Sequence, residues 1–230
     1  MPPRAWQDLV NEKEDAITPI REWVAATPFG AELLPCEPAD GQRALAALQV
    51  TTRSTMGALA FHTGGLLVDH GWLRVLGAGC ARLPRALDAW NALGQSSPRH
   101  HAGLLVADDA AGGFFAWYSE PRTIHYLAPD TLEWVDLELG YSEWLGAMLS
   151  EGLEKFYATL RWPGWQDEVG KLDGTQAMSF YPFLWAKGAP IGERSRRPVS
   201  VEELWSLSLH MAAELAKVPD GGKVEIKITE

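Results

Sequence analysis

The sequence predicts an α+β protein, in which amphipathic helices pack against a central antiparallel sheet with the topology of a meander. Two apolar runs, at residues 103–107 and 114–118, flank a turn segment that ends in two glycines, which is the pattern of a β-hairpin. Strand-like runs at 123–127 and 132–139 follow after short turns. Because short turns join consecutive strands in antiparallel fashion, the four runs predict neighbouring strands of one sheet.

The place of each strand in the sheet follows from its apolar pattern. Both hairpin runs are apolar at successive positions, so they are expected in the middle of the sheet with cover on both faces. Residues 132–139 include a clean alternation of apolar and acidic side chains, which is typical of a strand with one exposed face. Trp117 and Trp134 lie in these runs and are expected to be substantially buried, so replacing Trp117 with alanine is expected to cost about 3–5 kcal/mol.

Other elements are predicted on both sides of this region. Two short strands are expected upstream, at 66–68 and 72–76, with a turn between them. Helical patterns occur at six places, which begin at or span residues 18, 42–49, 84–93, 141–149, 153–160 and 200. Ser200 and Glu203 have the spacing of a capping box at the start of the last helix. Residues 173–198 are expected to be loop-rich with an aromatic plug at 180–185, and 223–229 predicts a terminal edge strand.

The chain is predicted to form a single domain over residues 1–230. Hydrophobic residues make up 47% of it and charged residues 22%, which is ordinary for a globular protein and argues against disorder. The sheet-bearing core is expected at about 55–160, and a helical and loop-rich C-terminal extension at about 161–230. No internal repeat, low-complexity tract or linker divides the chain.

The charge of the chain limits its partners. The formal net charge is -10, so most of the surface repels nucleic acid and favours a basic protein partner. A local basic cluster exists at Arg194, Arg196 and Arg197, and it is interpreted as a solvated loop. No stretch approaches the roughly 20 apolar residues that cross a bilayer, so no membrane partner is expected.

The two cysteines do not make a disulfide framework in a chain of this size. Cys80 is expected to be a buried structural thiol. The N-terminus carries early acidic residues and no signal-peptide pattern, and together these features predict a cytoplasmic location.

His62, Asp69 and His70 are the candidate catalytic residues. Two histidines and a carboxylate within nine residues suit a metal site or a shared proton. The spacing matches no common metal motif, and adjacent residues of a strand point to opposite faces. The alternative is a tight turn in which Asp69 accepts backbone N–H bonds, and this structural interpretation is preferred. It predicts that no catalytic residue or stoichiometric metal is present, and that Asp69→Asn lowers the melting temperature.

The other motifs do not predict a catalytic, metal or cofactor site. His100 and His101 are interpreted as part of a solvated loop, and Asp108 and Asp109 as part of a turn and not of a calcium loop. The nucleophile elbow, the phosphate-binding loop and the dinucleotide fingerprint are all absent, so no cofactor is predicted.

Eleven tryptophans are unusual for this length, and most are expected in the core. Trp162 and Trp165 lie in a loop with proline and glycine, next to Arg161. Because a loop does not easily bury two such rings, these three residues are predicted to form a binding surface.

Several segments resemble an uncharacterised bacterial family, domain-of-unknown-function family 2625. They are residues 61–77, 107–109 with 112–113, 126–134, and 156–157 with 161–162. This resemblance covers most of the chain and implies no known activity. More distantly, the strand order is similar to that of the SUKH superfamily, which contains many bacterial toxin-immunity proteins. That similarity implies a SUKH-like fold and a protein partner.

Two functions remain open. The first is a non-enzymatic, cytoplasmic protein-binding module, either immunity-like or regulatory. The alternative is a metal-dependent or hydrolase-like enzyme that uses His62, Asp69 and His70. Convergence of these three side chains in an open cleft is the observation that separates the two. The oligomeric state is not predicted.

Overall fold

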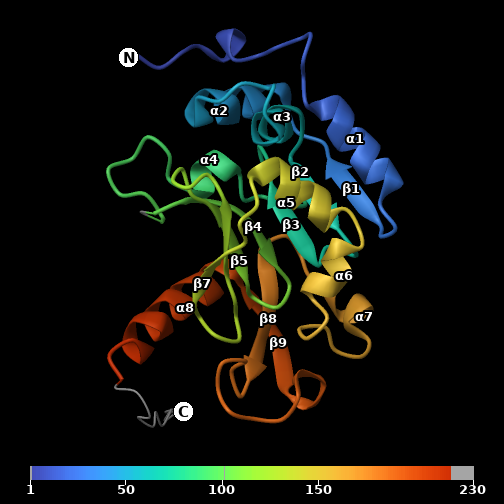
Figure 1. The fold of residues 1–230 in the computed structure, drawn as a ribbon, viewed down its shortest axis with the longest axis vertical. Helices are drawn as coiled ribbons and strands as arrows, with labels where there is room; N and C mark the ends of the chain where they lie inside the picture. The colour runs from blue at the N-terminus through green and yellow to red at the C-terminus, as the bar shows by residue number, and fades with distance from the viewer. Residues whose placement is uncertain (1, 101, 219–230) are drawn as a thin grey trace.

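The computed structural model describes residues 2–100 and 102–218, and its main feature is an antiparallel sheet of seven strands. The strands lie in the sheet in the order of the sequence (Figure 1): β1 (Ala31–Leu34), β2 (Gly65–Val68), β3 (Leu73–Leu76), β4 (Leu104–Asp109), β5 (Phe114–Trp117), β6 (Ile124–Leu127) and β7 (Trp134–Asp136). The prediction of an α+β fold with a central meander is therefore confirmed, and β4 and β5 lie in its middle as expected.

Most helices in the described part of the chain lie next to this sheet, on its two faces or at its edges. In chain order they are α1 (Ile17–Ala26), α2 (Pro38–Leu48), α3 (Thr55–His62), α4 (Leu87–Trp90), α5 (Tyr141–Met148), α6 (Gly152–Phe156), α7 (Trp165–Val169) and α8 (Val201–Leu215). Short 3₁₀ turns occur at Trp6–Asp8 and Ile191–Glu193. No helix in the described part of the chain has the length and apolar character to span a bilayer.

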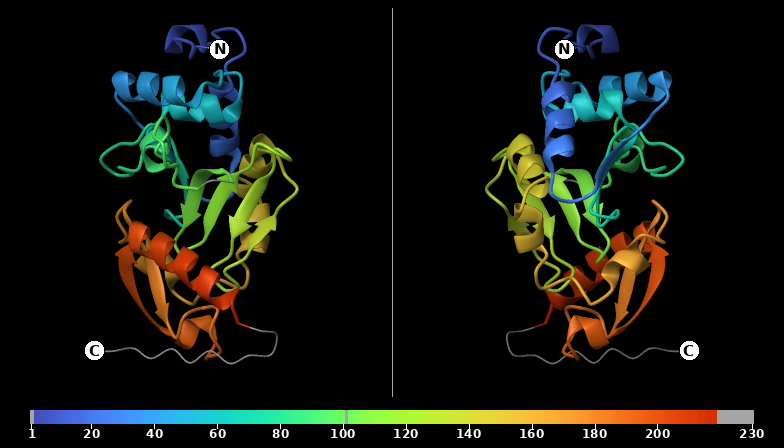
Figure 2. Two further views of the ribbon diagram at one scale, coloured as in Figure 1. Left: turned by 90° about the vertical axis from the view of Figure 1, so that its left-hand side faces the viewer. Right: turned by 90° about the vertical axis from the view of Figure 1, so that its right-hand side faces the viewer.

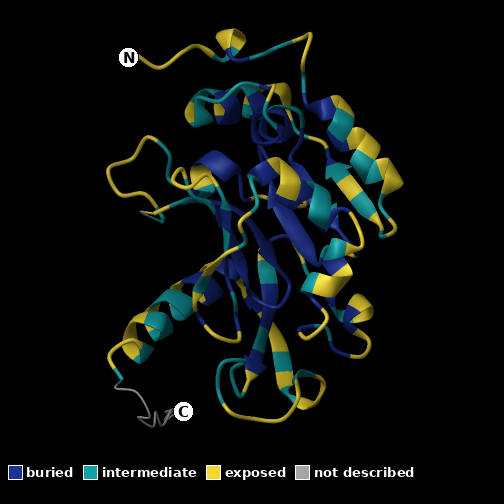
Figure 3. Ribbon diagram, in the orientation of Figure 1, coloured by how far each residue is buried: buried dark blue, intermediate teal, exposed yellow. Residues whose placement is uncertain are grey.

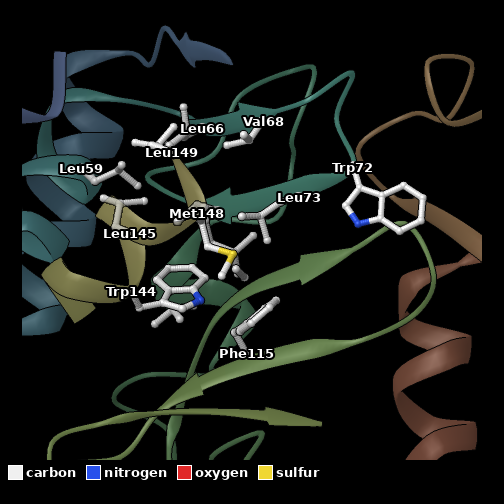
Figure 4. Close-up of a cluster of buried hydrophobic side chains, with 14 of the residues drawn as sticks. Leu59, Leu66, Val68, Trp72, Leu73, Phe115, Trp144, Leu145, Met148 and Leu149 are labelled. Atoms are coloured by element: carbon white, nitrogen blue, oxygen red, sulfur yellow. The ribbon is translucent and has the colours of Figure 1, made fainter. Parts of the chain in front are cut away.

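The first face of the sheet packs against α3 and α5. Side chains of the strands, such as Leu66 and Phe115, meet Leu59 of α3 and Trp144 of α5 (Figure 4), and all four are fully buried. The register explains this arrangement, because Leu66 lies opposite Val75, Val75 opposite Ala107 and Ala107 opposite Phe115. One continuous apolar row therefore crosses the sheet on this face.

The second face contains a row of mixed character. The register aligns Glu32 with Leu67, Leu67 with Arg74, Arg74 with Asp108, and Asp108 with Phe114. From Phe114 toward β7 the row is apolar and packs against Trp205 of α8, which lies diagonally below these strands in Figure 2. From Asp108 toward β1 the row is charged, and this half of the face contains the site described below.

The N-terminus of α8 forms as the sequence predicts. Ser200 Oγ accepts a hydrogen bond from the backbone N–H of Glu203 at 3.0 Å, so Ser200 is the N-cap. Val201, Leu204 and Trp205 at this end are buried, whereas the other end of the helix becomes exposed (Figure 3).

The expectation that 173–198 is loop-rich holds for residues 182–194, but it misses two strands. Residues Gln176–Tyr181 (β8) and Ser195–Ser200 (β9) pair as a two-stranded antiparallel sheet that packs beside α8. Proline and the arginine cluster in β9 conceal its strand pattern, and the long loop between the two strands conceals their pairing. β1 and α3 also lack a sequence signal strong enough to predict them, since β1 has four residues and α3 is apolar nearly all round.

Several elements are shorter than the sequence predicts. The helix expected at 84–93 is only Leu87–Trp90, and the strand expected at 132–139 is regular only at Trp134–Asp136. Trp117 and Trp134 are half-buried and not deep in the core. The edge strand expected at 223–229 lies outside the described residues. The division into one domain stays a prediction.

These burial differences predict different costs for two tryptophan truncations. Trp144→Ala is expected to lower the free energy of unfolding by about 3–5 kcal/mol, because its ring is fully buried between α5 and the sheet. Trp117→Ala is expected to cost less than Trp144→Ala, because Trp117 is half-buried. Urea unfolding of both variants measures the difference, and equal losses would contradict the placement of the two rings.

Candidate functional site

The three candidate catalytic residues lie in separate contacts. His62 Nε2 is 2.8 Å from Asp15 Oδ2 near α1. Asp69 Oδ2 accepts a hydrogen bond from Arg161 Nη2 at 2.7 Å, and exposed His70 rests edge-on against the ring of Trp165. Within the described residues, these contacts do not bring His62 together with Asp69 and His70. Within residues 2–100 and 102–218, no group of three or more His, Cys, Asp and Glu side chains is placed to hold a metal ion.

Asp69 and His70 belong to a tight turn between β2 and β3. Asp69, His70 and Gly71 all have positive φ, at 51°, 58° and 80°. The backbone N–H of Trp72 donates to the carbonyl of Asp69 at 2.9 Å and closes the turn. The expectation of a turn is therefore correct, but the expectation that the Asp69 carboxylate caps backbone amides is wrong. That carboxylate instead binds Arg161, which lies 92 residues further along the chain.

Arg161 lies among aromatic rings inside the protein. Its guanidinium carbon is 4.3 Å from the ring centre of Trp165 and 5.1 Å from that of Trp72. Trp162 and Trp165 are 1% and 7% exposed, so the expectation that this loop leaves them at the surface is wrong. Trp72 and the β8–β9 sheet enclose the loop, because Phe180 lies edge-on against Trp162. These residues stabilise the fold by cation–π and ring contacts.

Two arginines of the basic cluster, Arg194 and Arg196, are bound and not simply solvated, whereas Arg197 is exposed as expected. Arg196 forms an ion pair with Glu168 of α7 at 2.6 Å, and this hydrogen-bonded partner lowers the pKa of Glu168. Arg194 donates to backbone carbonyls of the β8–β9 loop, including that of Ala189 at 2.7 Å. The cluster therefore fixes the loop between β8 and β9 and the neighbouring helix.

A buried ion cluster lies on the second face of the sheet. The guanidinium groups of Arg74 and Arg85 both contact the carboxylate of Asp108, and all three side chains are at most 7% exposed. Arg74 also donates to the backbone carbonyls of Asp109 and Gln176, and Arg85 to that of Gly174 at 3.0 Å. Burial lowers the pKa of Arg74, while the charge of Asp108 opposes that shift. The cluster joins β3 and β4 to the start of β8.

Asp109 points to the opposite side and holds the β4–β5 turn. Its Oδ1 accepts the backbone N–H groups of Ala111 and Gly113, each at 2.9 Å, and its Oδ2 accepts the hydroxyls of Tyr126 at 2.7 Å and Tyr157 at 3.2 Å. Burial raises the pKa of Asp109, and the bonds from Gly113 and Tyr126 oppose this shift. Burial also raises the pKa of both tyrosines well above 10, so they remain hydrogen-bond donors.

The Asp109 network has acid–base groups but no room for a substrate. A Cβ atom on Gly113 would lie 2.2 Å from the Tyr126 hydroxyl and 2.4 Å from Asp109 Oδ2. The backbone therefore packs directly against the polar atoms, and the network serves the structure of the turn. The predicted turn begins after Asp109, because Asp108 and Asp109 are the last two residues of β4, and their buried carboxylates point to opposite faces of the sheet.

An open groove of about 690 Å³ lies beside β1, on the charged half of the second face. We name it the β1 groove. Leu67 and Arg74 of the sheet line it together with Ala31 and Glu32 of β1. The turn at His70–Gly71, Ala81–Arg82 and the segment from Val169 to Gly174 complete it. Its volume lies in the range of binding pockets, which is about 300–1,000 Å³.

The charged side chains that line the β1 groove are two acids, Glu32 and Asp173, and two arginines, Arg74 and Arg82. Glu32 and Arg82 pair at its rim at 2.6 Å, and Arg74 shares the carboxylate of Asp108 with Arg85. Asp173 has no ion-pair partner among the described residues, and it accepts hydrogen bonds from the N–H and hydroxyl of Thr175. These bonds lower the pKa of Asp173, so its carboxylate is ionised at neutral pH.

Sequence reasoning missed both the ion cluster and the groove. The sequence contains one sign of the ion cluster. Arg74 is the single charged residue in an otherwise apolar strand, and a charge in a buried strand needs a partner. The groove had none, because segments from four distant parts of the chain form it.

The fold and contacts define an α+β protein with a buried ion cluster and an open groove beside an edge strand of its main sheet. The chain belongs to the family described as "Protein of unknown function DUF2625", whose model matches residues 6–204. It is 41% identical over 216 residues to the putative uncharacterized protein YbfG of Escherichia coli K12, which covers 90% of this chain and 97% of the relative. It is 34% identical over 205 residues to an uncharacterized protein of Haemophilus influenzae, with 85% and 90% covered. No solved structure matches, and the similarity to the SUKH superfamily stays a prediction.

The ion cluster predicts a large effect for one carboxylate. Asp108→Asn is expected to lower the free energy of unfolding by about 3–5 kcal/mol, because it leaves two buried guanidinium groups without a counter-charge. The control is Glu32→Gln, which breaks an exposed ion pair and is expected to cost about 0–1 kcal/mol. Chemical denaturation measures both, and a loss below about 1 kcal/mol for Asp108→Asn would contradict the buried pairing.

The Asp69 contact predicts a smaller effect. Asp69→Asn is expected to lower the melting temperature, because Arg161 loses a charged hydrogen-bond acceptor that contributes about 1.5–3 kcal/mol. His70→Ala, one residue further, is expected to change it little because His70 is exposed. Thermal melts followed by circular dichroism compare the two, and a larger loss for His70→Ala would overturn this assignment.

Proposed function

We propose that the chain is a non-enzymatic protein-binding module that holds a segment of a basic protein partner in the β1 groove. The observation that carries the proposal is the groove itself, an open space of about 690 Å³ next to an edge strand of the main sheet. Grooves beside a sheet edge recur in the recognition of extended peptides.

Charge supports a basic partner. The chain has a net charge of -10, which steers cationic proteins toward it and repels the phosphates of nucleic acid. Within the groove, Asp173 offers an ionised carboxylate to a lysine or arginine of the partner. The proposed location is the cytoplasm, where Cys36 and Cys80 remain free thiols. The proposed role is neutralisation or regulation of the partner.

The contacts of the candidate catalytic residues favour binding over catalysis. His62 lies with Asp15 near α1, whereas Asp69 is committed to Arg161. An acid–base pair needs a shared cleft and a defined orientation, which these contacts do not supply.

A pull-down with matched variants tests the proposal. Ala81 is exposed and lines the β1 groove, so Ala81→Arg places bulk and positive charge there. Ala158→Arg makes the same change at an exposed position away from the groove. Wild type and Ala158→Arg are expected to retain a basic protein from lysate of the producing cells, and Ala81→Arg is expected to lose it. Calorimetry with the purified partner then measures the affinities.

Two results would contradict the proposal. One is a partner that Ala81→Arg binds as tightly as wild type does. The other is purified protein that retains no specific partner but turns over a substrate in an activity screen, with loss of that activity in His62→Ala or His70→Ala.

A further inference from the structure

We infer that the outer edge of β1 accepts an extended, basic segment of the partner as an added strand, with every second side chain of that segment in the β1 groove. This inference rests on the proposed function and specifies how the partner is held.

The hydrogen bonds of β1 leave its outer edge open. β1 is a terminal strand of the seven-stranded sheet and pairs only with β2. The N–H of Asp69 donates to the carbonyl of Gly30 at 2.6 Å, and Ala31 lies opposite Val68. Since antiparallel strands alternate between bonded and non-bonded pairs, the peptide groups of Ala31 and Leu33 point away from β2.

These outward groups have no other partner within the described residues. No backbone or side-chain hydrogen bond reaches the N–H or C=O of Ala31 or Leu33 from residues 2–100 or 102–218. Both residues are partly exposed as whole residues, and their side chains pack against the core on the side where α1 contacts β1. An added strand satisfies these groups in the way that β-augmentation does.

The opposite edge of the sheet is less suited to an added strand. β7 has three residues and carries Asp136, with Glu133 and Glu138 close by in sequence. A strand of three residues offers an added strand fewer peptide groups to pair with than the four residues of β1 do. On β1, the single charged side chain is Glu32, which lies on the groove face and pairs with Arg82.

The groove lies where alternate side chains of the added strand would point. Glu32 shares its face with Leu67 and Arg74, which line the groove. A residue paired beside Glu32 on an added strand projects to this same face, because side chains directly opposite each other in a sheet lie together. The net charge of -10 and the ionised carboxylate of Asp173 favour lysine or arginine in the added segment, at positions that reach Asp173 and not Arg74 or Arg82.

The test uses phage-displayed random dodecapeptides, selected on the wild-type protein and then synthesised for fluorescence-polarisation titration. Ala31→Pro removes the outward N–H at the first residue of an edge strand, a place where proline is tolerated. Ala31→Thr adds side-chain bulk but keeps that N–H. Peptides rich in alternate lysine or arginine are expected to bind the proline variant about tenfold more weakly than wild type, and to lose clearly less affinity with the threonine variant, which controls for a change of side chain at this position.

A second measurement needs no variant of the protein. N-methylation of the selected peptide at successive positions removes one N–H at a time, and only alternate positions of an added strand donate to β1. An alternating loss of affinity is expected, and uniform sensitivity or none would overturn strand addition. This measurement decides the question if Ala31→Pro fails to fold.

The outcomes separate this inference from the proposed function. Peptides that tolerate Ala31→Pro but are lost in Ala81→Arg would place binding in the groove without strand addition. A partner retained in the pull-down while no peptide is selected would likewise refute strand addition and leave the module function in place. Selected peptides that are acidic would refute the charge assignment. Absence of both partner and peptide would refute the proposed function itself.

Discussion

The contact of Arg74 and Arg85 with Asp108 is the constraint on which the rest of the second face depends. Removing three charged groups from water is costly, and the cost is offset only when the charges and their remaining N–H groups find partners. Backbone carbonyls at Asp109, Gly174 and Gln176 accept several of these N–H groups, while Arg74 Nε and Arg85 Nη2 have no hydrogen-bond partner among the described residues. Because two of these carbonyls belong to the segment that leads into β8, the cluster fixes that segment against the sheet.

The same segment forms one wall of the β1 groove. The position of this wall therefore depends on the ion cluster that fixes the segment. Asp173 and Gly174 line the groove, and Gly174 accepts the hydrogen bond from Arg85. A Cβ on Gly174 would lie 2.1 Å from the carbonyl oxygen of Arg82, so the two walls approach as closely as backbone allows. The groove is thus bounded by segments fixed through buried contacts, which reduces the ordering cost of binding.

The sequence predicts features that depend on residues close together in the chain, and it does not predict features that depend on residues far apart in the chain. The β4–β5 hairpin, the meander and the Ser200 cap were predictable, because their signals are local turns, caps and periodicities. The burial of Trp162 and Trp165 was not, since it depends on Trp72 and on a β8–β9 pairing across a long loop. The partner of Asp69 was likewise unpredictable from a local motif, because Arg161 reaches it from 92 residues away. A charged residue in an apolar strand was the one visible sign of long-range polar contacts, and Arg74 carried it.

The contacts of the buried carboxylates limit the chemistry in which they can take part. Asp69, Asp108 and Asp109 are all buried, and each is occupied by arginine, tyrosine or backbone donors that hold the fold. A catalytic carboxylate must keep a lone pair or proton available to a substrate, and these carboxylates face groups of the protein instead. Among the described residues, Ala31 and Leu33 at the edge of the sheet have peptide groups without a hydrogen-bond partner, and Asp173 in the β1 groove has a carboxylate without an ion-pair partner. In the proposed mode of binding, backbone pairing would supply affinity with little dependence on sequence, and the charge and shape of the groove would supply selectivity.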